Sequence, residues 1–158
     1  MRVLVTGVAG FVGGHLVDLL LDEEPGVEVI GLDSSPGNRA RSLGIEVIGA
    51  DLEDPEAVLT ALARARPDRI VHLAAQSSPR DSWLDPAGTF RTNLFGLLHL
   101  LEAALRQSLT PRVLVVGSAE EYGLVKAEDL PVKEDTPLRP TTLIQTGGRE
   151  EVRSNGSR

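Results

Sequence analysis

The chain has 158 residues, enough for one domain with a sizeable core, and its 41% hydrophobic content is typical of a globular protein. A net charge of −7 argues against nucleic acid or anionic membranes as partners, and the absence of cysteine excludes disulfides and thiolate metal sites. No apolar stretch has membrane-spanning length and no signal-like leader is present, so we expect a soluble, cytoplasmic protein.

The first apolar strand, Val3–Val5, runs through Thr6 into three glycines spaced three residues apart, Gly7, Gly10 and Gly13. Glycines so placed between a strand and a helix are typical of a turn that binds the pyrophosphate of a dinucleotide. We expect Gly7 to adopt a conformation that a Cβ would resist, Gly10 to let N–H groups approach the phosphates, and Gly13 to let the helix pack closely. Because such glycines also occur in ordinary loops, the turn needs independent support.

Asp33 provides that support. It follows the apolar run Val29–Leu32, about twenty residues after the turn, where a carboxylate would accept hydrogen bonds from an adenosine ribose. A carboxylate would also repel the 2′-phosphate of NADP, so we expect NAD as the cofactor. NADP is the alternative, since Arg39 and Arg41 follow closely and could soften the preference.

The remaining chain alternates between predicted strands and helices. We expect strands at 27–32, 45–48, 70–73 and 112–116, and helices at 11–22, 55–65 and 85–107, with a loop at 34–38 and mostly loop from Gly117 onward. In the first helix an apolar stripe of Phe11, Leu16, Leu19 and Leu20 should be buried. The last strand is apolar throughout, which is typical of a strand covered on both faces. The fold class is therefore α/β, a Rossmann-type doubly wound parallel sheet, incomplete, with about five strands in the order 3-2-1-4-5.

Ligands of such sheets bind beyond the carboxyl ends of the strands, next to the first strand. The notable residues of this sequence fall at those ends and should share one crevice. They are Gly7, Gly10, Asp33, Asp51, Ala74, Ala75 and Ser118.

Five motifs together resemble the extended short-chain dehydrogenase/reductases that act on nucleotide-linked sugars, the epimerase/dehydratase family. They occupy residues 6–13, 51–52, 72–76, 92–96 and 116–123. The resemblance covers residues 1–142, which we expect to form the dinucleotide-binding domain. Residues 76–83, 120–123 and 134–140 look most like the branch of GDP-mannose 4,6-dehydratase and GDP-4-keto-6-deoxy-mannose reductase.

The resemblance implies a role for each of several residues. Those expected to bind or shape the site of the cofactor are Gly7, Gly10, Phe11, Val12 and Gly13 at the pyrophosphate, Asp33 at the ribose, Asp51 and Leu52 at the adenine, Leu73, Ala74 and Ala75 along the nicotinamide half, and Asn93, which holds the surrounding backbone. Ser118 would hydrogen-bond the sugar oxygen that is oxidised or reduced, and Glu120 would be the general base of a dehydratase. A nucleotide-diphosphate sugar, with a GDP-sugar favoured, and a homo-oligomer formed through the helix at 85–107 are the implied partners.

Simpler interpretations exist for some of these residues. Asp51 could only cap the turn before Asp54, Asn93 could be a satisfied polar residue, and Glu120 could belong to a solvated acidic turn. Trp83 is expected to anchor a loop by packing, and the alternative is that it stacks on a base. Structural roles are expected for all three histidines, which share no metal-ligand spacing: His15, His72 and His99.

The resemblance ends where family members carry a catalytic tyrosine and, four residues later, a lysine. After Arg139-Pro140 this chain has neither, and we do not expect Tyr122 and Lys126 to replace them. We expect residues 143–158 to be an unrelated, disordered tail and the chain to be inactive as it stands. The alternatives are a non-catalytic dinucleotide sensor or interaction module, and a fragment without a role that self-associates through exposed apolar surface.

Overall fold

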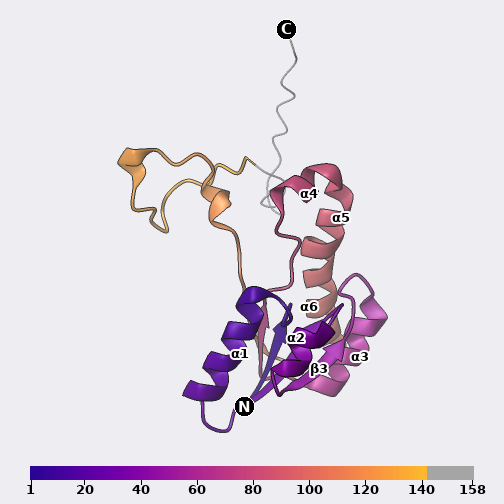
Figure 1. The fold of residues 1–158 in the computed structure, drawn as a ribbon. Coiled ribbons are helices and arrows are strands. Elements are labelled where there is room, and N and C mark those ends of the chain that lie inside the picture. Colours follow the sequence, from indigo (N-terminus) through magenta and orange to yellow (C-terminus); the bar gives the residue numbers. More distant parts are fainter. Residues whose placement is uncertain (142–158) are drawn as a thin grey trace.

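Five parallel strands form a single sheet, in the order β3-β2-β1-β4-β5 (Figure 1). The computed structural model describes residues 1–141, apart from the side chains of residues 39–41. The strands are β1 (Arg2–Thr6), β2 (Glu28–Asp33), β3 (Glu46–Gly49), β4 (Arg69–His72) and β5 (Arg112–Val115). Thr6 pairs with Leu32 of β2 and with His72 of β4, so the carboxyl ends of the central strands are level. The predicted fold class and strand order are confirmed.

Helices cover the two faces of the sheet. α1 (Phe11–Glu23) lies on one face, and α3 (Pro55–Ala65) and α6 (Gly96–Arg106) lie together on the other (Figure 1). Alternate residues of β1 point to opposite faces, as in any strand. Leu4 packs in one core cluster with Leu62 of α3 and Leu100 of α6, whereas Val5 packs in a second cluster with Val17 of α1.

The predicted helix at 85–107 is one helical stretch with an irregular middle. It consists of α5 (Pro86–Phe90), a π-helical turn η1 (Arg91–Phe95) and α6, and the π turn was not expected. Two short helices, α2 (Gly37–Ser42) and α4 (Pro79–Leu84), and two 3₁₀ turns, η2 (Ala119–Tyr122) and η3 (Ala127–Asp129), complete the structure. α3 begins as predicted, because the Asp54 carboxylate accepts the N–H groups of Glu56 and Ala57 at 3.0 and 3.2 Å.

The apolar stripe of α1 is buried only in part, since Leu16 and Leu20 pack against a core cluster, and the expectation that both faces of the last strand are covered is wrong. In α1, Phe11 is 70% exposed and Leu19 is 56% exposed, because the small residues Gly13 and Gly14 face the sheet with Val17. β5 is an edge strand, and helices within residues 1–141 do not cover both of its faces, so Leu114 is exposed. The segment after β5 runs away from the sheet (orange in Figure 1).

The tail predicted at 143–158 lies outside the described residues. Within residues 1–141, no helix is long and apolar enough to cross a membrane. The same part of the chain holds no cluster of histidine, aspartate and glutamate suited to a metal ion.

Candidate functional site

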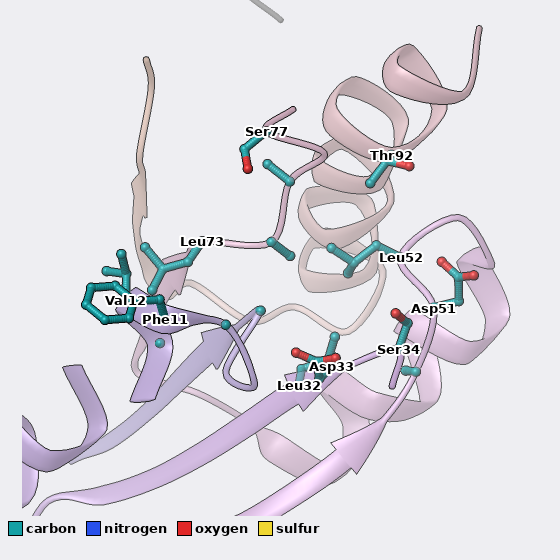
Figure 2. Close-up of a pocket in the computed structure, with 16 residues that line it drawn as sticks. Phe11, Val12, Leu32, Asp33, Ser34, Asp51, Leu52, Leu73, Ser77 and Thr92 are labelled. Atoms are coloured by element: carbon teal, nitrogen blue, oxygen red, sulfur yellow. The ribbon is translucent and has the colours of Figure 1, made fainter. Parts of the chain in front are cut away.

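A cavity of about 470 Å³ opens at the carboxyl ends of the central strands (Figure 2). This volume is in the range of cofactor sites. Every predicted cofactor-binding residue except Asn93 lines it. In Figure 2, Asp33 lies at the end of β2 and Asp51 lies on the loop that follows β3, with Thr92 on the helical stretch beside this loop. The lining residues to which the sequence analysis gave no role are Leu32, Ser34, Ala50, Ser77 and Thr92. Thr92 and Ser77 lie in stretches that carry the family resemblance, and the other three adjoin a predicted residue; these are the signals that could have found them.

The glycine turn has the geometry expected of it at two positions. Gly7 has φ +67°, and a Cβ there would lie 2.9 Å from the Cα of Ala74. A Cβ at Gly13 would lie 2.5 Å from the carbonyl oxygen of Gly7, so only glycine lets α1 pack this closely. Gly10 caps α1 without a side-chain hydrogen bond, and no acidic residue occupies the first turn. The positive, N-terminal end of α1 therefore faces the cavity, and its N–H groups can donate hydrogen bonds to an anion.

Asp33 is held rigidly at the edge of this cavity. Its Oδ2 accepts the N–H of Ala9 at 3.0 Å, and its Oδ1 accepts the N–H of Ser35 at 3.0 Å. Each carboxylate oxygen has further acceptor capacity, which remains for hydroxyl groups of a ligand. The Ala9 bond also ties Asp33 to the glycine turn, so the two sequence features predicted to act together are physically linked.

Thr6 and His72 form a buried pair that fixes the wall between β1 and β4. The Thr6 Oγ1 accepts the N–H groups of Leu73 and Ala74 at 3.2 and 3.1 Å and lies 2.9 Å from the His72 Nδ1. Because both lone pairs of the hydroxyl are used, its proton is donated to Nδ1. Burial lowers the pKa of His72, which agrees with a neutral ring that accepts this bond. The histidine is structural, as expected.

A second cavity of about 390 Å³ adjoins the first and shares Leu73, Ala74, Ala75 and Ser77 with it. Asn93, Ser118 and Glu120 line this second cavity. Asn93 holds the backbone of Gln76 on both sides: its Oδ1 accepts the N–H at 2.7 Å, and its Nδ2 donates to the carbonyl at 3.0 Å. The Ser118 Oγ accepts the N–H of Glu120 at 3.3 Å. The structure thus brings both candidate catalytic residues to the cavity next to the candidate cofactor site.

Several alternative interpretations can now be compared with the geometry. Asp51 both lines the first cavity and closes a turn, since its Oδ1 accepts the N–H of Glu53 at 2.9 Å. Trp83 is 61% exposed, so the expectation of a packed loop anchor is wrong. Tyr122 and Lys126 line neither cavity and do not share a helix, and Lys126 pairs with Glu128 at 3.4 Å.

Comparison with known proteins agrees with the fold and the site. Residues 4–143 match the family described as GDP-mannose 4,6 dehydratase. UDP-glucose 4-epimerase of Mycolicibacterium smegmatis is 36% identical over 154 residues, which cover 93% of this chain and 48% of that protein. The chain belongs to the nucleotide-sugar epimerase/dehydratase family of extended short-chain dehydrogenase/reductases.

Two solved structures show the same architecture. UDP-glucose 4-epimerase of Thermus thermophilus, in complex with NAD, matches with a TM-score of 0.82 and 37% identity over 93% of this chain and 47% of its own. RMD from Pseudomonas aeruginosa, complexed with NADPH, matches with a TM-score of 0.75 and 29% identity over 93% and 46%. This chain therefore spans about half the length of the relatives that it matches.

Proposed function

We propose that this chain is the NAD-binding part of a nucleotide-sugar dehydratase, reductase or epimerase. The observation that carries the proposal is the first cavity, where the glycine turn, the positive end of α1 and the fixed Asp33 carboxylate meet. Relatives solved with NAD and with NADPH support a nicotinamide cofactor. The Asp33 carboxylate favours NAD over NADP, because it would repel a 2′-phosphate.

Each part of the cavity has a proposed partner on the cofactor. The pyrophosphate would lie at Gly7, Gly10, Phe11, Val12 and Gly13, with Gly10 leaving room for its approach. The ribose would bind Asp33 and the adenine would lie at Asp51 and Leu52. The nicotinamide half would follow Leu73, Ala74 and Ala75 toward the second cavity, on a wall that Asn93 holds. A bound nicotinamide supplies hydride exchange with a carbon of the sugar.

The second cavity is the proposed place of the sugar. The Ser118 hydroxyl would hydrogen-bond the reacting sugar oxygen, and the Glu120 carboxylate would take a proton in a dehydration. We limit the substrate class to nucleotide-diphosphate sugars, because the matched family is described by GDP-mannose whereas two of the relatives above are named for UDP-glucose. The preference for a GDP-sugar stays a prediction.

We further propose that the 158-residue chain does not catalyse the conversion of a sugar substrate. Its single tyrosine, Tyr122, and Lys126 line neither cavity, so neither residue is placed to transfer a proton to a sugar. The second candidate function, a non-catalytic dinucleotide sensor or interaction module, rests on the same observation. Incubation with NAD and with UDP- and GDP-sugars tests the lack of turnover that both candidates share: NAD should bind and the sugars should stay unchanged, and any interconversion refutes it.

We also propose that the chain self-associates and that it is located in the cytoplasm. The outer side of η1 and α6 carries a stripe of leucines that are 37–75% exposed: Leu94, Leu98, Leu101 and Leu105. A stripe with this spacing suits helix-to-helix packing. The cytoplasmic location rests on the absence of cysteine.

Melting curves with NAD test the cofactor site, with Gly10→Ala and Gly49→Ala as a matched pair. Gly10 has φ −69°, which alanine adopts, but its Cβ would stand 3.0 Å from the Gly7 carbonyl oxygen, on the cavity wall. A Cβ at Gly49 meets only the Pro36 side chain at 3.9 Å. NAD should raise the melting temperature of the wild-type chain and of Gly49→Ala, and raise that of Gly10→Ala far less. An equal rise in all three would refute the site.

A further inference from the structure

The loop that carries Asp51 and Leu52 follows β3 and has no strand partner of its own. Asp51 lines the first cavity, and Leu52 is 5% exposed with its side chain in the core between the sheet and α3 and α6. A loop can offer a defined hydrogen-bonding edge to a ligand only if other residues hold the backbone of the loop in place.

One side of the helical stretch 92–99 holds this loop. The His99 Nδ1 lies 2.8 Å from the carbonyl oxygen of Leu52, and since a carbonyl only accepts, Nδ1 carries the proton and donates it. Gly96 is buried against the same residue, where a Cβ would come within 3.0 Å of the Leu52 Cβ. One turn earlier, the Thr92 hydroxyl donates to the Glu53 carboxylate at 2.6 Å. Two hydrogen bonds and one close backbone approach from the same side of the helical stretch therefore hold Leu52 and Glu53.

We propose that His99 is a positioning residue for the adenine end of the dinucleotide site. By donating its Nδ1 proton to the Leu52 carbonyl, it fixes the Leu52–Glu53 peptide group, whose N–H donates to the Asp51 carboxylate, and hence the hydrogen-bonding edge that the loop offers to a purine. This inference rests on the proposed function, and it assigns the histidine a part in base recognition that spacing alone did not indicate. The chemical class recognised is a 6-aminopurine nucleotide.

The test compares NAD with nicotinamide hypoxanthine dinucleotide, in which the 6-amino group of the base is replaced by an oxygen. His99→Ala removes the donor. His99→Asn keeps it, because the amide nitrogen of asparagine is separated from Cα by the same number of bonds as Nδ1 of histidine. Gln107→Ala is the matched control: Gln107 follows α6, its Nε2 donates to the Leu59 carbonyl of α3 at 2.7 Å, and it lines neither cavity.

Calorimetric titration should show that the wild-type chain prefers NAD to the hypoxanthine analogue by about tenfold, the worth of one or two hydrogen bonds. His99→Ala should lose roughly threefold or more of that preference, whereas His99→Asn and Gln107→Ala keep it. A purely structural histidine would weaken both ligands equally and leave the ratio unchanged, which would overturn the inference. Melting temperatures of the unliganded variants show which of them fold, and His99→Leu, which fills the space but has no donor, carries the test if the alanine variant does not fold.

The failure of this inference is distinguishable from that of the proposed function. If the wild-type chain binds neither dinucleotide, the NAD site itself is refuted and the inference falls with it. If it binds NAD but does not discriminate against hypoxanthine, or if His99→Asn loses discrimination although it is folded, the cofactor site stands and the role of His99 is refuted.

Discussion

Thr6→Val is the substitution that most sharply probes how the cofactor crevice is built. Thr6 is completely buried, and valine has almost the same shape without the hydroxyl. The substitution leaves three groups without their partner: the N–H groups of Leu73 and Ala74 and the Nδ1 of His72. An unsatisfied buried polar group costs about 1–3 kcal/mol; since the two N–H groups lie beside a cavity that water can enter, we expect a total loss of about 2–4 kcal/mol.

Urea unfolding followed by far-ultraviolet circular dichroism measures this loss. Thr6→Ser is the control, because it keeps the hydroxyl and removes one buried methyl group, worth about 1 kcal/mol. The valine variant should also bind NAD more weakly, since the wall at Leu73 and Ala74 is no longer fixed. A valine variant within about 0.5 kcal/mol of the wild-type chain, or a serine variant that is equally destabilised, would refute the role given to the Thr6 hydroxyl.

Three further predictions concern pH, cofactor choice and assembly. Burial lowers the pKa of His72 below its ordinary value of 6.5, so just below pH 6.5 the unfolded chain binds a proton that the folded chain does not. The free energy of unfolding should therefore be at its full value above pH 6.5 and fall below it, by up to about 1.4 kcal/mol per pH unit. His72→Asn should flatten this slope in urea titrations between about pH 5 and 7.5. Asp33→Asn should weaken NAD about tenfold and narrow its advantage over NADP in calorimetry, whereas an unchanged ratio would contradict the ribose role. Leu98→Glu, at a position 42% exposed in the leucine stripe, should convert an oligomer to a monomer in sedimentation velocity, and a wild-type chain that is already monomeric would contradict the stripe as an interface.

The parts of the fold that follow from the sequence are those where local chemistry leaves little choice. The φ of Gly7 and the close packing at Gly13 follow from glycines placed between a strand and a helix, and Asp54-Pro55 gives the start of α3 directly. The strand order follows from the alternation of elements and the handedness of their connections. These features required no knowledge of tertiary contacts.

Other features depend on packing that periodicity does not encode. Phe11 and Leu19 fall on an apolar stripe, yet the glycines of α1 face the sheet because the backbone must come close there. The π turn at Arg91–Phe95 has no local signature in the sequence; within it, Thr92 lines one cavity and Asn93 lines the other. The link between His99 and the Leu52 carbonyl joins residues 47 positions apart, so it could not be read from spacing along the chain.

Chemical-shift mapping of NAD on the isotope-labelled chain tests the proposed cofactor site most directly. The amide signals that move should cluster at the glycine turn of residues 7–13, at Asp33 and Ser34, at Asp51 and Leu52, and at Ala74 and Ala75, with smaller changes elsewhere. Such a pattern would establish that the dinucleotide binds in this crevice. The absence of changes at saturating NAD, or changes confined to the exposed leucines of α6, would contradict the account.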